Sequence, residues 1–246
     1  FPFSEANPPP EGDPHIDAWT LPRQILRRWA KHNGRTMYVG GNLAIYYPGE
    51  RMFSPDLIAV LDVPAHDRDS WLVAKEGKGL DLAMEVVVAG KRRKDLLDNL
   101  ERYARLGISE YFVLDWRRRT LHGYRLVSEG GEGAYERMVP QAGRLVSRVL
   151  GLELFMEGGL VRFALGDAVL LSSDELVGKL EGLMSEAVER ASDLESQLLE
   201  EQRRREEEQH LREEEQHLRE EEQRRREALE AEVAALRRAL SELEKR

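Results

Sequence analysis

Cysteine is absent from this chain of 246 residues. The chain therefore cannot form disulfide bonds, hold a metal through thiolates or use a cysteine nucleophile. This absence excludes cysteine-type zinc fingers and cysteine hydrolases, and it suits a reducing compartment. The chain also lacks an apolar run of the roughly 18 residues that a membrane-spanning helix needs, so no membrane partner is expected.

The start of the chain has neither the basic segment nor the apolar stretch of a signal peptide. We therefore expect a cytoplasmic protein. The first residue is Phe1 and not Met, so further residues are expected upstream. The formal net charge of −9 argues against a protein that coats nucleic acid non-specifically, although it is compatible with a local basic patch.

Proline content and apolar periodicity divide the chain into three parts. Five of the ten prolines lie within the first 14 residues, where no apolar period occurs, so residues 1–19 are predicted to be a flexible Pro-rich leader. Residues 20–170 alternate between strand-like and helical periods, which predicts one α/β domain with a β-rich extension. Residues 174–246 are predicted to be a charged helix that ends in a coiled coil.

The middle part shows a defined order of strand-like and helical segments. Apolar spacing predicts a short first helix through Leu21 and Trp29 that ends before Gly34, and a second helix over residues 91–106 that Gly107 stops. Strands are expected at residues 37–39, 43–47, 57–61, 80–88, 110–115 and 120–127. After a Gly-rich break at 129–133, the extension is expected to hold strands at 146–150, 152–155 and 160–165. This order indicates a mixed sheet with helices packed on it.

The tail contains a seven-residue repeat, Glu-Glu-Glu-Gln-His-Leu-Arg, at 206–212 and 213–219, with a degenerate copy at 220–226. Such a repeat is typical of a coiled coil. Only one residue per heptad is apolar between 200 and 227, where Glu–Arg pairs four residues apart contribute about 0.3–0.5 kcal/mol each. A proper apolar seam follows at Leu229, Val233, Leu236, Leu240 and Leu243. We expect a helix that starts at a Ser173–Asp174 cap, reaches on the order of 100 Å, and forms a homo-oligomer or binds a protein partner.

Two carboxylates lie at strand ends in the middle part. Asp56 precedes the strand at 57–61, and Glu85 lies near the end of the strand at 80–88. Carboxylates on neighbouring strands can share a Mg²⁺ ion, which polarises a phosphoryl oxygen and activates water. Acidic residues at strand ends are also common in α/β proteins. In that case Asp56 caps a turn after Pro55, and Glu85 pairs with a nearby Arg or Lys.

Several short motifs occur in a family-like order. They are Ser54-Pro55-Asp56-Leu57, Glu76-Gly77-Lys78-Gly79, Leu82-Ala83-Met84-Glu85-Val86, Arg93-Lys94-Asp95, Tyr103-Ala104-Arg105-Leu106-Gly107-Ile108 and Glu110-Tyr111-Phe112-Val113-Leu114-Asp115. Over roughly residues 35–128 the chain resembles the Uma-two type "putative restriction endonucleases", a branch of the PD-(D/E)xK nuclease superfamily. The resemblance implies a restriction-endonuclease-like mixed sheet with flanking helices and DNA cleavage that depends on Mg²⁺ or Mn²⁺. It makes Asp56 and Glu85 the metal ligands, together with a backbone carbonyl beside Glu85.

The resemblance also shows a departure at the catalytic lysine. In this family the lysine lies on the helix, four residues after the aspartate that corresponds to Asp95, and this chain has Asn99 there. Val87 occupies the strand position that the wider superfamily uses. An amide donates a hydrogen bond but brings no charge. Three interpretations remain open. In the first, Asn99 positions the water and the metal alone supplies charge. In the second, Lys91 or Lys94 reaches into the site from the same helix. The third interpretation is an inactive scaffold or interaction protein that self-assembles through its coiled coil.

A basic cluster, Lys91-Arg92-Arg93-Lys94, precedes the same helix. Four cations at a helix N-terminus oppose the helix dipole. The cluster is either a solvated face or a DNA-binding site whose phosphate partners offset the repulsion. Arg117 to Arg119 are candidates for the same basic edge. The six histidines show no spacing that is typical of metal ligands.

Overall fold

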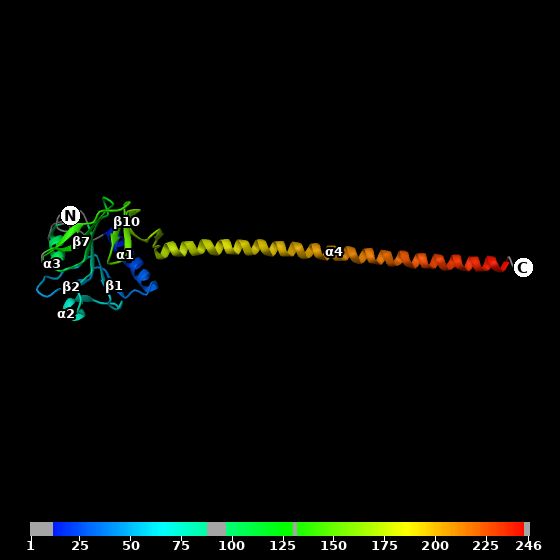
Figure 1. The fold of residues 1–246 in the computed structure, drawn as a ribbon, viewed down its shortest axis with the longest axis horizontal. Helices are drawn as coiled ribbons and strands as arrows, with labels where there is room; N and C mark the ends of the chain where they lie inside the picture. The colour runs from blue at the N-terminus through cyan, green and yellow to red at the C-terminus, as the bar shows by residue number, and fades with distance from the viewer. Residues whose placement is uncertain (1–11, 88–96, 130–131, 244–246) are drawn as a thin grey trace. The chain divides into compact units, whose positions relative to one another are not determined.

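The computed structural model describes residues 12–87, 97–129 and 132–243. The chain divides into two compact units, Phe1–Leu176 and Val177–Arg246. The first unit contains an α/β fold, and the second consists of helix (Figure 1). Among the described residues, no helix combines the length and the apolar character that a bilayer crossing requires.

A mixed sheet of six strands forms the centre of the first unit. Its spatial order is β1-β3-β5-β6-β7-β8. All neighbours pair antiparallel except β5 and β6, which pair parallel. The chain between β5 and β6 contains helix α3 (Asn99–Arg105), because parallel strands need a crossover connection. The strands are β1 (Met37–Gly40), β3 (Leu57–Leu61), β5 (Leu82–Val86), β6 (Glu110–Asp115), β7 (Thr120–Glu129) and β8 (Glu132–Arg137).

Helix α1 (Asp13–His32) and a second sheet pack in one hydrophobic cluster with one face of the mixed sheet. The helix buries Ile25, Leu26 and Trp29 against alternate residues of β1, β3 and β5. The second sheet is antiparallel and has the order β12-β11-β10-β9. Its strands are β9 (Leu145–Ser147), β10 (Leu152–Glu157), β11 (Leu160–Leu165) and β12 (Ala168–Val169).

The other face of the mixed sheet carries an aromatic cluster. Tyr103 of α3 lies edge-on to Tyr111 of β6, with ring centroids 5.0 Å apart, and its ring centroid is 5.4 Å from that of Phe53. A small parallel sheet of β2 (Ala44–Tyr46) and β4 (Ser70–Leu72) contributes Ile45 and Trp71 to this cluster. The one-turn helix α2 (Val73–Glu76) follows β4 and buries none of its residues. Successive residues of β5 therefore alternate between two cores.

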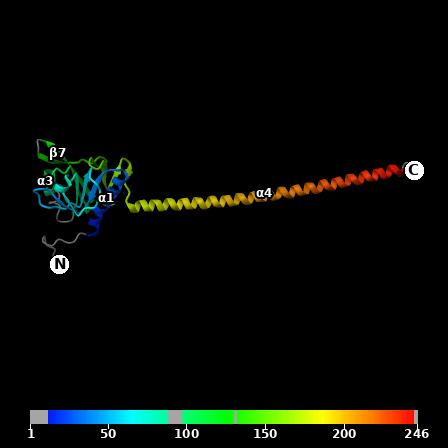
Figure 2. The same ribbon diagram turned by 90° about the horizontal axis from the view of Figure 1, so that it is seen from below.

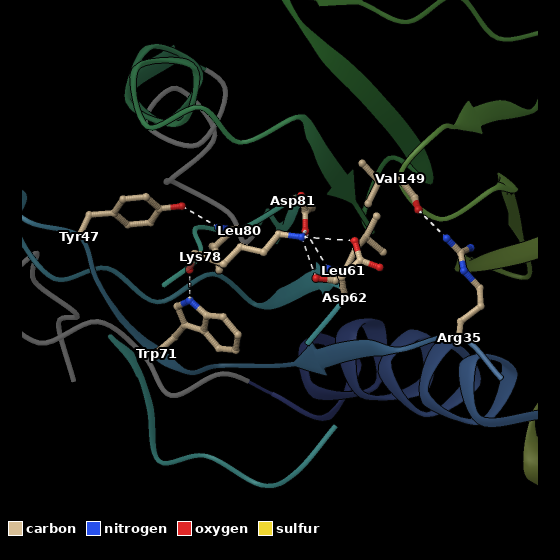
Figure 3. Close-up of polar contacts among 9 residues, drawn as sticks. All are labelled: Arg35, Tyr47, Leu61, Asp62, Trp71, Lys78, Leu80, Asp81 and Val149. Carbon is tan, nitrogen blue, oxygen red and sulfur yellow. Dashed lines mark hydrogen bonds and ion pairs between the residues drawn. The ribbon is translucent and has the colours of Figure 1, made fainter. Parts of the chain in front are cut away.

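A polar network fixes the loop between α2 and β5 (Figure 3). The ammonium of Lys78 donates to the carbonyl of Leu61 at 2.7 Å and lies 3.1 Å from the carboxylate of Asp81. That carboxylate accepts the backbone N–H of Leu61 at 2.7 Å. The indole of Trp71 donates to the carbonyl of Lys78 at 2.9 Å. These bonds hold the start of β5 against the end of β3, and so they set the register on which the candidate site depends.

Two expectations about local structure need correction. Helix α1 begins at Asp13, so residues 13–19 are helical and do not belong to a flexible leader. Pro14 suits this first turn because its missing N–H would have no intrahelical acceptor there, and Ala18 is buried. The expected Gly-rich break is a hairpin, since β7 and β8 pair up to Glu129 and Glu132.

Helix α4 runs from Ser173 to Leu243, and it is unbroken when seen from a second direction (Figure 2). Its cap is Ser172, one residue before the expected cap. The hydroxyl of Ser172 accepts the N–H of Glu175 at 3.2 Å, and the carboxylate of Glu175 accepts the N–H of Ser172 at 2.6 Å. This reciprocal pair is a capping box. Arg162 of β11 lies 2.9 Å from the same carboxylate and so fixes the first turn of α4.

Candidate metal and catalytic site

Strand register brings the two candidate metal ligands together. Strands β3 and β5 pair antiparallel with Leu57 opposite Met84. Asp56 directly precedes Leu57 and Glu85 directly follows Met84, so the two candidate ligands are the next residues beyond this pair. The carboxylate of Asp56 accepts the N–H of Val86, the residue after Glu85, which brings Asp56 to this end of β5. Glu85 lies on the face with the aromatic cluster, because Ala83, two residues before it, belongs to that cluster and Tyr103 contacts Glu85.

Asp56 is held by groups from β5, α1 and the turn after β1. Its carboxylate accepts the backbone N–H of Val86 at 2.6 Å, and its other oxygen lies 3.5 Å from Nε2 of the buried His15. The carbonyl of Asp56 accepts the N–H of Asn42 at 3.2 Å. A Cβ at Gly41 would lie 2.9 Å from this carbonyl and 2.5 Å from the ring of Trp19. Only glycine therefore lets α1 and the Asp56 backbone approach so closely.

Glu85 receives two hydrogen bonds from α3. Tyr103 donates its hydroxyl to Oε1 at 2.7 Å, and the amide of Asn99 donates to the same oxygen at 3.4 Å. Asn99 and Tyr103 are four residues apart, so they lie on one face of the helix. Burial raises the pKa of the Tyr103 phenol, and the negative charge of Glu85 raises it further. Tyr103 therefore stays a neutral donor that orients the carboxylate.

The structure also locates the two positions for the catalytic lysine. Asn99 is 8% exposed and directs its amide to Glu85. Val87 is buried in the aromatic cluster, so an apolar residue replaces the cation at the strand position. The basic cluster Lys91-Arg92-Arg93-Lys94 lies outside the described residues, and so do the two lysines that could reach into the site. Arg117 and Arg119 line a cavity of about 420 Å³ at the start of α1.

The donor set of this site suits a hard divalent cation. In the described ranges, no group of three His, Cys, Asp or Glu side chains could hold a metal ion. A cation at this position would therefore take oxygen from Asp56, Glu85, a neighbouring backbone carbonyl and water. Mg²⁺ prefers such ligands, since it often keeps several waters and uses only one or two carboxylates. The residues present fit Mg²⁺ or Mn²⁺ and do not fit a nitrogen- or sulfur-rich zinc site.

Two residues of the site were missed by sequence reasoning. Tyr103 packs its ring in the aromatic cluster, and its hydroxyl also donates to Glu85. Its spacing of four residues from Asn99 is a local signal for this role. His15 was assigned to the leader, and its contact with Asp56 joins residues 41 positions apart in the sequence. No local pattern predicts that contact.

Comparison with known proteins identifies the family. Residues 5–157, more than half of the chain, match the Uma2 family, which is described as "Putative restriction endonuclease". A search of curated proteins gives no match. Among solved structures, a "putative nuclease belonging to DUF820" from Anabaena variabilis ATCC 29413 is similar, with 14% sequence identity and a TM-score of 0.45. The similarity covers 61% of this chain and 87% of that one. The protein described here belongs to the Uma2 "putative restriction endonuclease" family, with a long charged helix after the family region.

Proposed function

We propose that the first unit is a metal-dependent DNA endonuclease with a reduced set of catalytic groups. The proposal is supported by the β3–β5 register, in which Leu57 pairs with Met84, and by the hydrogen bond from the N–H of Val86 to the carboxylate of Asp56. Membership of the Uma2 family supports a phosphodiester substrate. Mg²⁺ or Mn²⁺ is the proposed cofactor, with Asp56 and Glu85 as its side-chain ligands.

Each residue of the site has a role in this proposal. A bound cation supplies positive charge to a phosphoryl oxygen and lowers the pKa of a water molecule. The N–H of Val86 and the ring of His15 orient the carboxylate of Asp56. Tyr103 and Asn99 orient Glu85 from α3. These orientations matter because the loss of a partner of a metal ligand commonly lowers metal affinity by about 10–100-fold.

DNA binding is assigned to basic side chains beside the site. The exposed Arg117 and Arg119 line a cavity with Pro14 and Asp17 at the start of α1, close in sequence to His15. Lys91-Arg92-Arg93-Lys94, which lie outside the described residues, are also proposed to bind DNA. Phosphate contacts of this kind fix the register of a duplex but carry no base specificity. Binding should therefore weaken steeply as salt is raised.

Asn99 favours a second candidate function, a nuclease-fold scaffold without catalysis. Its amide donates to Glu85 and brings no positive charge to the site. The missing charge would otherwise stabilise the phosphate as it becomes more negative, and one such donor is commonly worth about 10²–10³ in rate. In this case the fold would bind DNA or a protein partner and would assemble through α4.

Two measurements on the same proteins separate these functions. Nicking of supercoiled plasmid would be followed with Mg²⁺ or Mn²⁺, and thermal melts would be recorded with and without the cations. The proposed nuclease shows both nicking and a metal-dependent rise in Tm, and Asp56→Asn combined with Glu85→Gln abolishes both. A rise in Tm without nicking supports the scaffold. No rise in Tm at millimolar metal would overturn the proposed metal site.

A further inference from the structure

Helix α4 keeps one heptad register from its first turns to its end. An apolar seam with alternating spacings of three and four begins the helix, and a second seam ends it. Val233 in the second seam follows Leu198 in the first by five complete heptads, so both seams occupy the same two heptad positions. The first seam is Val177, Leu180, Met184, Ala187, Ala191, Leu194 and Leu198, and the second is Leu229, Val233, Leu236, Leu240 and Leu243.

The same two positions carry strictly alternating charges between the seams. The heptad position that Val177 and Met184 occupy in the first seam is arginine in every heptad of the central segment. The heptad position that Leu180, Ala187 and Leu194 occupy is glutamate in every heptad of that segment. The charged positions are Glu201, Arg205, Glu208, Arg212, Glu215, Arg219, Glu222 and Arg226. The central segment therefore continues the seam with charged residues and does not interrupt it.

Those side chains of this stripe that the structure describes are not covered within the second unit. Met184, Leu198 and Leu229 are 67%, 58% and 54% exposed, and every described charged position of the stripe is also exposed. Some charges pair along the helix, as Glu201 does with Arg205 at 2.7 Å. Such exposed pairs contribute little, and the apolar ends lose the energy of burial unless another helix covers them.

Charge excludes a parallel, in-register pair of these helices. In a parallel two-stranded coiled coil each seam residue faces its own copy. Arg212 would face Arg212 and Glu215 would face Glu215, and the other charged layers would match like with like in the same way. Eight successive layers of like charge would oppose association. In an antiparallel pair the two seam positions face each other, so arginine meets glutamate.

One antiparallel register satisfies every layer from Met184 to Leu243. Placing Leu198 opposite Leu229 puts Leu194 opposite Val233, and it puts the small Ala191 and Ala187 opposite Leu236 and Leu240. The same alignment puts each arginine opposite a glutamate, namely Arg205–Glu222, Arg212–Glu215, Arg219–Glu208 and Arg226–Glu201. A shift of one heptad in either direction places two apolar residues of each chain opposite charges. The complementarity of size and charge therefore selects a single alignment.

We propose that α4 pairs with α4 of a second copy of this chain as an antiparallel coiled coil, with its two-fold axis between Glu213 and Glu214. Paired layers extend from Met184 to Leu243 in each chain. Val177 of one copy then lies about 110 Å along the axis from Val177 of the other, at 1.5 Å per residue. This pairing does not depend on whether the first unit is catalytic.

The absence of cysteine allows a direct test in the whole chain. Two differently tagged copies would be co-expressed, one with Leu198→Cys and one with Leu229→Cys, and then oxidised and separated on a non-reducing gel. The antiparallel register brings these two sulfurs together, so a disulfide-linked dimer carrying both tags is expected. Each variant expressed alone faces leucine and gives no cross-linked dimer. Ser196→Cys, on the outer face two residues away, measures collisional background.

Every outcome of this test is informative. Cross-linking of Leu198→Cys with itself would show a parallel pair and overturn the proposal. Glu201→Cys with Arg226→Cys repeats the test at a charged layer, in case loss of a leucine disrupts the seam. A monomeric parent chain in sedimentation equilibrium, or no mixed dimer above background with either cysteine pair, would also overturn it.

Discussion

At the scale of single residues, the proposed chemistry depends on Asn99. Its amide reaches Glu85 from the first turn of α3, and its side chain is almost fully buried. A lysine at this position would keep its stem along the helix and bring a positive charge to the proposed metal ligands. We expect Asn99→Lys to increase Mg²⁺-dependent plasmid nicking by about tenfold or more, because it restores charge beside the scissile phosphate.

Asn99→Met is the matched control for this change, since it adds length without charge. An increase in both variants would show that removing the amide, and not adding the cation, relieves the site. An Asn99→Lys protein that binds metal but nicks no faster than the parent would show that other elements of catalysis are also lost.

Tyr103 gives a second test at this scale. Its hydroxyl donates to Glu85 at 2.7 Å, so Tyr103→Phe removes an orienting bond and leaves the ring in its core. We expect Mn²⁺ affinity, measured by isothermal titration calorimetry, to fall by about tenfold. Tyr135→Phe is the control, because its buried hydroxyl donates to the carbonyl of Ile108 and not to the site. Equal losses in both variants would assign the effect to general destabilisation.

The site was only partly predictable at this scale. Asp56 and Glu85 lie within motifs that can be recognised along the chain, and Asn99 is found from its spacing of four residues after Asp95. The orienting partners cannot be recognised in that way, because they depend on tertiary packing. The close approach of Trp19 to Gly41 holds α1 where His15 reaches Asp56. Both Trp19 and His15 fall within residues 1–19, which were predicted to be a leader.

At the scale of elements, the buried Glu110 joins strand β6 to its neighbours. Its carboxylate is 1% exposed, accepts the N–H of Arg148 at 2.8 Å and the hydroxyl of Ser147, and pairs with Arg125 of β7. We expect Glu110→Ala to lower the free energy of unfolding by about 3 kcal/mol or more, because it leaves the donors around the buried carboxylate without their acceptor. Denaturant unfolding would measure this. Glu153→Ala, which removes a one-third exposed ion-pair partner of Arg144, should cost about 1 kcal/mol or less.

The capping box at the start of α4 makes stability depend on pH. Hydrogen bonding from Arg162 lowers the pKa of Glu175 below its ordinary value of 4.5. A lowered pKa contributes stability above pH 4.5 that is lost as the pH falls through the folded-state value. We expect Glu175→Gln to reduce the slope of Tm against pH below about 4.5 and to leave that slope unchanged between pH 6 and 8. A parallel shift of the whole curve would mean that the charge is not responsible.

Elements with a clear period were predictable, and elements that depend on partners were not. Strands β3, β6 and β11 have the expected bounds because each is a short apolar run between turns. Strand β4 and helix α2 are short, and Trp71 is their only fully buried residue, so neither has a period of its own. The β7–β8 hairpin contains glycines that suggest a break, but Gly133 pairs with Ser128, and a Cβ at Gly133 would lie 3.0 Å from the side chain of Leu126.

At the scale of the whole molecule, the tail and the α/β unit should separate cleanly. Deleting residues 187–246 retains Glu175 and its bond to Arg162, so the remaining unit should stay folded and become monomeric. Light scattering and thermal melts would measure both properties. An unchanged oligomeric state after the deletion would place the association surface in the α/β unit. A chain that fails to fold would show that the units depend on each other.

The charged middle of α4 has a consequence for the rate of amide hydrogen exchange. Helical pairs normally open first at their ends, where the fewest contacts must break. In α4 the ends carry the apolar seams, and residues 201–226 have only exposed leucines and charge pairs. The amides of the centre should therefore exchange faster than those of 184–198 and 229–243. Raising salt to about 1 M, where the Debye length is about 3 Å, should widen this difference. The helical pair would then open first at its centre and not at its ends.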